Sequence, residues 1–325
     1  MILDTAFLTI YDPATRPLSF LGIEGVTLAC GALTLVHALR ARRLGDGGAL
    51  FAWVCTFVYG VCLEIASYNA FPKFSHGQFT VMFYHHKLPL YISAFYPMIN
   101  YTGQRTVQRL GLSARVEPLV VGLLLVLIDL PFDTLGPDTG WWAWDMTDPN
   151  VHARWFGVPV TSYYWQLSWG AILSGICRWA EPHMRVLGSP GRPIRFARLA
   201  LALPVAGVTM ALGRLAFLPF DVLVPLGVPD GTILVVGLGI ALALLVLGRR
   251  EPTGDPPDRL LLAIPFLFFA FHVALVLSLR GRIGDWGGKT ALILGATVLG
   301  MGISGAATRA ATRSPLRPAR SGDPP

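Results

Sequence analysis

Long apolar runs, separated by short polar joints, make up most of the chain. Several of them reach the roughly 20 residues that an α-helix needs to cross a bilayer. The pattern predicts an all-α fold, a polytopic integral membrane bundle of about nine transmembrane helices, with a range of seven to nine. The predicted spans are 18–39, 49–68, 79–100, 116–134, 158–178, 197–219, 223–248, 259–279 and 290–307.

These spans leave room for one membrane domain and little else. We expect an N-terminal segment at 1–17, a single transmembrane helical domain at 18–308 and a cytoplasmic tail at 309–325. Proline, arginine, serine and glycine dominate the tail from Ser314 onward, a composition that favours disorder.

Composition and charge agree with a membrane protein. Hydrophobic residues make up 53% of the chain and charged residues only 14%, whereas a soluble domain carries about 25% charged residues. Most of the 26 lysines and arginines lie in alternate joints and in the tail. Basic residues favour the cytoplasmic side, so we expect the N-terminus outside and the C-terminus inside. The expected location is a bacterial inner (plasma) membrane, with the lipid bilayer and not nucleic acid as partner; the sequence leaves the oligomeric state open.

The cysteines argue against a metal site. Cys30, Cys55, Cys62 and Cys177 all lie inside apolar runs, without CxxC or Cys/His ligand spacing. Neither a zinc site nor a disulfide framework is expected, and no redox cofactor motif is evident.

Ionisable residues inside apolar runs are the main candidates for a site. Glu64, Asp129 and Asp133 lie at membrane depth, where a charge is costly and usually marks function or a buried ion pair. For Asp129, an ion pair with Arg214 or Lys87 is the alternative. In the predicted orientation, the polar residues of the spans fall in the outer half of the membrane. They are Glu24, Glu64, His85, His86, Lys87, Asp129, Asp133, Arg214 and Asp221. His85 and His86 would point about 100° apart on a helix, so one of them is expected to face a cavity.

A tryptophan-rich loop follows the two aspartates. Trp141, Trp142, Trp144 and Trp155 lie close together in the sequence, and Tyr164 follows on the next predicted span. An aromatic belt at the membrane interface is the simpler interpretation. Aromatic faces beside carboxyl groups also suit a cationic ligand or a carbocation intermediate.

This central stretch resembles a known family. Glu64, the segment with Asp129 and Asp133, Gly140-Trp141-Trp142-Ala143-Trp144 and Trp155-Phe156-Gly157-Val158-Pro159 are similar in type and order to motifs of the integral-membrane carotenoid biosynthesis proteins. That family includes the carotenoid 1,2-hydratase of bacterioruberin-type pathways. The resemblance covers about residues 64–165, and the chain departs from it in the acidic insertion from Asp145 to Asn150.

The resemblance implies hydration of a terminal double bond in an isoprenoid substrate, a lyase reaction without a cofactor. We expect Asp129 or Glu64 to be the acid and His85 to position or deprotonate the water. The expected substrate-binding residues are Trp141, Trp142, Trp144, Trp155, Tyr164, His86 and Arg214. A membrane terpene-cyclase-like enzyme, and a transporter or lipid-binding protein without chemistry, remain as alternatives.

Overall fold

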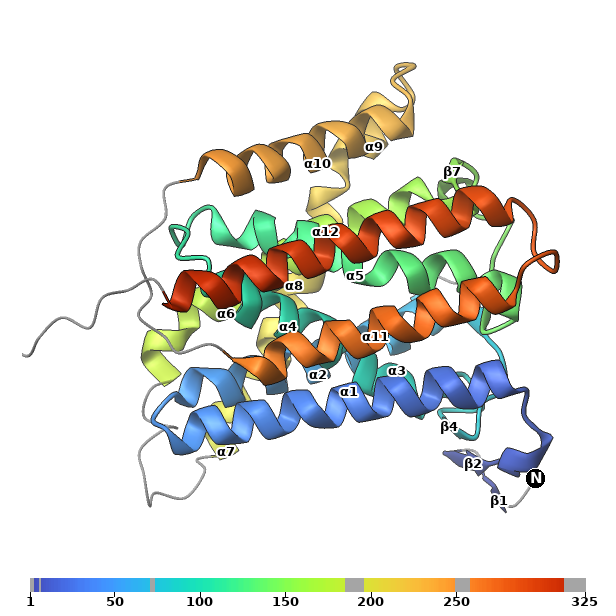
Figure 1. Ribbon diagram of the computed structural model, residues 1–325, viewed down its shortest axis with the longest axis horizontal. Coiled ribbons are helices and arrows are strands. Elements are labelled where there is room, and N and C mark those ends of the chain that lie inside the picture. Colours follow the sequence, from blue (N-terminus) through green and yellow to red (C-terminus); the bar gives the residue numbers. More distant parts are fainter. Residues whose placement is uncertain (1–2, 6, 71–73, 185–195, 249–257, 313–325) are drawn as a thin grey trace, which may run out of the picture.

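The computed structural model describes residues 3–5, 7–70, 74–184, 196–248 and 258–312 (Figure 1). Within these residues the chain is mainly helical. In chain order the helices are α1 (Leu18–Arg43), α2 (Gly47–Ala70), α3 (Leu90–Tyr96), the π-helical turn η2 (Pro97–Tyr101), α4 (Thr102–Gln108), α5 (Glu117–Thr139), α6 (Val160–Met184), α7 (Phe196–Leu199), α8 (Ala202–Ala216), α9 (Leu218–Leu223), α10 (Asp230–Leu247), α11 (Arg259–Ser278) and α12 (Trp286–Thr312), with 3-10 turns η1 (Pro13–Thr15) and η3 (Pro149–Val151).

Seven stretches of described helix are long and apolar enough to cross a membrane, which confirms the predicted helical membrane bundle. They are Leu18–Arg43, Gly47–Ala70, Glu117–Thr139, Phe196–Leu223, Asp230–Leu247, Arg259–Ser278 and Trp286–Arg309. The other two predicted spans, 79–100 and 158–178, correspond to the series α3–η2–α4 and to α6.

The predicted span 79–100 is wrong over its first residues. Val81–Phe83 and Leu88–Pro89 form the antiparallel strands β4 and β5, and helix begins only at Leu90. In the turn between them, Tyr84, His85 and His86 have φ values of 52°, 54° and 62°. An α-helix needs φ near −63°, so this apolar run cannot be helical here.

Helix α5 forms the centre of the bundle (Figure 1). It packs against α4, α6, α10, α11 and α12. In its most apolar 18-residue window, 94% of the residues are buried, against 17% in α10. Glu117, Asp129 and Asp133 on α5 therefore face protein, whereas most of α10 faces outward.

The strands gather at one end of the bundle, with β1, β2 and β4 near the N-terminus and β7 on the other side of the same end (Figure 1). One antiparallel sheet has the order β1–β2–β4–β5, and two more consist of the pairs β3–β6 and β7–β8. The remaining strand bounds are β1 (Leu3–Asp4), β2 (Leu8–Ile10), β3 (Phe74–His76), β6 (Trp142–Trp144), β7 (Arg154–Trp155) and β8 (Val158–Pro159). Glu24 on α1 anchors the loop before β4, since its carboxylate accepts from the N–H and hydroxyl of Thr80 at 2.9 and 2.5 Å.

The opposite end is held by ion pairs between helices. Arg105 pairs with Asp46 at 2.8 Å and with Glu181 at 3.0 Å. Asp258, which precedes α11, lies 3.0 Å from His37 Nε2. Burial raises the pKa of Asp258, but the hydrogen bond and charge of His37 outweigh it and hold this pKa well below its usual range.

At the C-terminal end, α12 continues to Thr312, so the predicted tail at 309–325 begins inside a helix. Residues 313–325, where disorder is expected, lie outside the described residues.

Candidate active site

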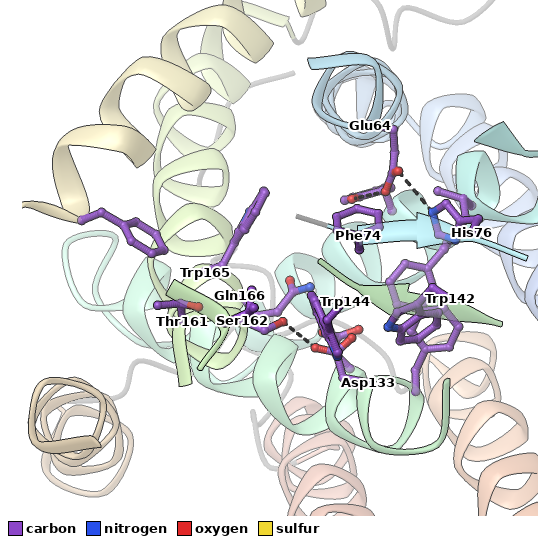
Figure 2. A pocket seen from close by; sticks show the side chains of 17 residues that line it. Glu64, Phe74, His76, Asp133, Trp142, Trp144, Thr161, Ser162, Trp165 and Gln166 are labelled. Carbon is purple, nitrogen blue, oxygen red and sulfur yellow. Dashed lines mark hydrogen bonds and ion pairs between the residues drawn. The ribbon is translucent and has the colours of Figure 1, made fainter. Parts of the chain in front are cut away.

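A narrow cavity of about 90 Å³ lies below the β3–β6 pair, between α2, α3, α5 and α6 (Figure 2). Three carboxyl groups line it: Glu64 from α2, and Asp129 and Asp133 from α5. Most of the remaining wall is aromatic. The rings are those of Phe74, Phe95, Tyr96, Phe132, Trp142, Trp144, Trp165 and Phe217.

Glu64 is buried and accepts hydrogen bonds on both oxygens. The Tyr68 hydroxyl donates to Oε2 at 2.5 Å, and the Tyr96 hydroxyl donates to Oε1 at 2.8 Å. His76 Nε2 lies 3.3 Å from Oε2 (Figure 2). The other nitrogen of this histidine, Nδ1, is buried without a hydrogen-bond partner among the described residues. Glu64 and His76 thus form a connected acid–base pair with one nitrogen left for a ligand.

A glycine allows Tyr96 to reach Glu64. Gly60 lies one helical turn before Glu64, and a Cβ added there would be 2.3 Å from Cγ of Tyr96. The Tyr96 ring therefore lies directly on the backbone of α2. The π-helical turn η2 begins at the next residue, Pro97, a type of turn that often occurs at functional sites.

Asp129 and Asp133 lie one turn apart on α5 and face the same cavity. The Ser162 hydroxyl donates to Asp133 Oδ2 at 2.5 Å, and the Gln166 side chain hydrogen-bonds Asp129. Asp129 Oδ1 is buried and has no partner in the described part of the chain. The proposed ion pair with Arg214 or Lys87 is not formed, because Arg214 pairs with Asp221 at 2.6 Å and Lys87 is exposed.

The register of two strands places the aromatic wall. β3 and β6 are antiparallel, with His76 opposite Trp142 and Phe74 opposite Trp144. The Trp142 ring lies against Phe132 at 4.4 Å between centroids, and Gly136 leaves space for it, since a Cβ there would be 2.2 Å from the ring. The indole N–H groups of Trp142 and Trp144 are buried without partners among the described residues, so the wall offers hydrogen-bond donors as well as aromatic faces.

The structure thus brings together five residues that the sequence singled out. Glu64, Asp129, Asp133, Trp142 and Trp144 all line the cavity.

Two other predicted residues lie near the site but do not line the inner cavity. Trp141 is fully buried and packs against Phe271 and His272. Arg214 lines a neighbouring, wider cleft.

Four predicted residues lie away from the cavity. His85 is exposed in the β4–β5 turn, and His86 Nδ1 lies 3.1 Å from the Tyr11 hydroxyl. The expectation that one of these histidines faces a cavity from a helix is wrong, because their backbone is left-handed. The Trp155 ring is partly exposed and packs on Gly231 at the start of α10. Tyr164 points to α8, where its hydroxyl donates to the carbonyl of Ala216 at 3.1 Å.

Sequence reasoning missed the histidine of the site. His76 lies beside Glu64 because β3 pairs with β6, and no local sequence pattern predicts that pairing. Ser162, Gln166 and Tyr96 carry no distinctive spacing either. Only Tyr68 could have been found from the sequence, because it lies four residues after Glu64 and therefore on the same helix face.

Chemically, the site combines a carboxylate that accepts hydrogen bonds, a pair of acids without a basic partner and an aromatic wall. Among the described residues, no group of three or more His, Cys, Asp or Glu side chains could hold a metal ion. The arrangement is suited to proton transfer to and from an apolar ligand.

Comparison with known proteins places this site within a family. No curated protein and no solved structure matches the chain. A domain of unknown function, DUF7802, matches residues 11–184, more than half of the 325 residues. The matched region contains every cavity-lining residue except Phe217. The chain therefore belongs to the DUF7802 family.

Proposed function

We propose that this protein is a membrane enzyme that adds water to a terminal carbon–carbon double bond of an acyclic isoprenoid lipid such as a carotenoid. One observation carries the proposal. Two separate acid centres, Glu64 and the Asp129–Asp133 pair, face one aromatic cavity, and the aspartate pair has no basic partner among the described residues.

The two centres suit opposite roles in proton transfer. Two ionised carboxyl groups so close together in a buried place would repel each other, so the Asp129–Asp133 pair is suited to hold a proton. Glu64 accepts hydrogen bonds from the Tyr68 and Tyr96 hydroxyls and has His76 Nε2 at 3.3 Å, an arrangement that suits a proton acceptor. Acid and base are thus present in one cavity.

In the proposed reaction, the protonated aspartate gives its proton to the inner CH carbon of the terminal double bond, and the π-electron pair forms the new C–H bond. The outer carbon, which carries two methyl groups, becomes a tertiary cation, which the faces of Trp142, Trp144 and Phe132 stabilise. A water oxygen then forms the C–O bond, and its proton passes to the Glu64–His76 pair. The net change is the addition of one water, without oxidation or reduction, once a proton returns from this pair to the aspartates.

Size favours hydration over cyclisation. A cavity of about 150 Å³ holds one benzene molecule, whereas the cavity beside Glu64 has about 90 Å³. It accommodates the end of a chain and leaves little space for a ring to close. This supports the hydratase rather than the cyclase alternative.

We also propose nine spans, with α3–η2–α4 and α6 crossing the membrane, and an N-terminus outside the cell. The support is that arginines of the described joints, such as Arg43, Arg105 and Arg178, lie opposite the strand-bearing end, which would place the site in the outer half of a bacterial plasma membrane. An alkaline phosphatase fused after Thr312 should then be inactive, and an active fusion would reverse the orientation.

The test is product analysis in a bacterial host that accumulates lycopene and other acyclic carotenoids. Expression should yield a pigment heavier by one water in the mass spectrum. Asp129→Asn and Glu64→Gln should abolish it, whereas Asp230→Asn, a control on α10 away from the cavity, should not. An isomer of unchanged mass would indicate a cyclase instead. No change in any isoprenoid, with protein present in the membrane, would contradict the proposal.

A further inference from the structure

A second, wider hollow opens beside the candidate active site. Its volume is about 550 Å³, against about 90 Å³ for the inner cavity. This outer cleft lies between α2, α6 and α8 and the loop after β6. Trp165 and Phe217 line both hollows and therefore mark the boundary between them (Figure 2 labels Trp165).

Small or unbranched residues on the facing sides of α2 and α8 leave the space for the cleft. Leu63, Ala66 and Ala70 lie on one face of α2, at spacings of three and four residues. Two of these three are alanines, whose small side chains leave space in front of α8. On α8 the facing apolar residue is Met210.

One side of the boundary is a break in a helix. Pro219 has no N–H with which to bond the carbonyl of Leu215, so α8 ends at Ala216 and α9 starts at Leu218. Phe217 stands at this break, and its ring packs edge-on against Tyr164 with 5.4 Å between centroids.

The other side of the boundary is a supported tryptophan. Trp165 Nε1 lies 3.4 Å from the Tyr59 hydroxyl, and its ring lies 4.7 Å from that of Trp169. Both boundary rings are thus held by contacts with other side chains, and we call the boundary between the two hollows at these rings the neck.

The charged groups of the outer cleft already have partners within the protein. Arg214 and Asp221 pair at 2.6 Å. Asp145 accepts from the N–H and the hydroxyl of Thr147, which hold the pKa of this carboxyl below its usual range. Asp148 is bound in the same way by Asn150. What the cleft offers to a ligand is therefore mainly its apolar wall.

We propose that the outer cleft binds the hydrocarbon chain of an extended polyisoprenoid, whose terminal double bond reaches the inner cavity through the neck between Trp165 and Phe217. This inference rests on the proposed hydratase function and adds the substrate class: long, acyclic and uncharged. The inner cavity holds only a chain end, so the rest of the substrate needs another place. The outer cleft lies within the 300–1,000 Å³ that is usual for ligand pockets.

Photolabelling tests the cleft independently of turnover. The full chain in phosphatidylcholine nanodiscs is irradiated with an acyclic isoprenoid hydrocarbon that carries a diazirine in mid-chain, and labelled peptides are identified by mass spectrometry. Adducts are expected on residues 63–70 and 210–217. Ala66→Leu should reduce them about fivefold or more by filling the cleft, while Ala243→Leu on the exposed face of α10 should not. Asp129→Asn should leave labelling intact.

Unchanged labelling in Ala66→Leu, or adducts confined to outward-facing helices such as α10, would overturn the inference. A turnover measurement adds a second criterion. Ala66→Leu should lower kcat/KM about tenfold for an eight-unit acyclic isoprenoid but little for a two-unit one, which is too short to occupy much of the outer cleft. Equal losses for both would contradict the proposal. If neither substrate is hydrated, the proposed function fails, and the labelling result still decides whether the cleft binds the chain.

Discussion

The helices before residue 184 and those after residue 196 differ in what they bury. Every buried carboxyl group among the described residues lies in the first region: Glu24, Glu64, Glu117, Asp129 and Asp133. The second region is more exposed. In its apolar helical windows 17% to 39% of the residues are buried, against 39% to 94% in the windows of the first region. The family match covers the first region and ends at residue 184.

The difference suggests a division of labour within the proposed enzyme. The first region carries the acid–base groups and the aromatic wall. The second contributes Phe217 to the inner cavity, and Met210 and Arg214 to the outer cleft. Changes in the first region should therefore affect the chemistry, and changes in the second should affect stability or the accepted chain.

The largest expected effect contrasts two buried histidines, one in each region. His76→Gln removes the base partner of Glu64 and should lower turnover about 100-fold or more. His272→Gln changes a histidine whose Nδ1 lies 2.8 Å from the Phe268 carbonyl, outside the cavity, and should lower the melting temperature with little loss of turnover. Equal losses of turnover in both variants would remove the distinction between the regions.

A smaller effect separates the wall of the site from the core beneath it. Trp142→Phe keeps an aromatic ring but loses the indole N–H, and should lower turnover about tenfold, worth about 1.4 kcal/mol. Trp141→Phe should instead lower the free energy of unfolding by about 1–2 kcal/mol, since Trp141 is fully buried beside Phe271. Turnover and thermal unfolding of both variants check this; the reverse pattern would show that Trp141 is the functional ring.

A matched pair of glycine changes gives the next contrast. Gly60→Ala forces the Tyr96 ring off α2 and away from Glu64, and should lower turnover about fivefold or more. Gly239→Ala on α10 meets no other atom within 4 Å, so it should stabilise the helix by up to about 1 kcal/mol. If Gly60→Ala retained full turnover, the contact between Tyr96 and Glu64 would have no role in the reaction.

The smallest expected effect concerns pH at the opposite end of the bundle. The pKa of Asp258 is lowered in the folded protein, so its stabilising contribution is present above the unfolded value of about 3.9 and is lost as the pH falls below it. Asp258→Asn keeps a side chain suited to cap α11 but removes the charge. The melting temperature of the original protein should fall toward that of the variant as the pH is lowered from about 4 to about 2; a constant gap would contradict this assignment.

Much of the fold could be predicted because a membrane span is a local property. About 20 apolar residues in a row need no partner to be recognised, and the predicted bundle follows from such runs alone. The β4–β5 hairpin could not be predicted this way, because its flanking residues are as apolar as a span. Only the left-handed backbone of Tyr84, His85 and His86 distinguishes it.

The site likewise has a part that local sequence predicts and a part that depends on non-local contacts. Glu64, Asp129 and Asp133 are recognisable because a carboxyl group is costly in an apolar run. Their convergence, and the choice of His76 over His85, depend on the contact between β3 and β6, which is not local. Likewise, spacing alone did not distinguish Trp142, in the wall, from Trp141, in the core, since β6 begins at Trp142 and its pairing with β3 decides which ring faces the cavity.

The β3–β6 pair also has a consequence for how the protein assembles. His76 is synthesised before α3, α4 and α5, and its partner strand only after them. The contact between His76 and Trp142 can therefore form only after α5 has been synthesised. Since a slip of one residue in this short ladder would turn one of these two side chains away from the other, the proposed site depends on strand register as well as on side-chain identity.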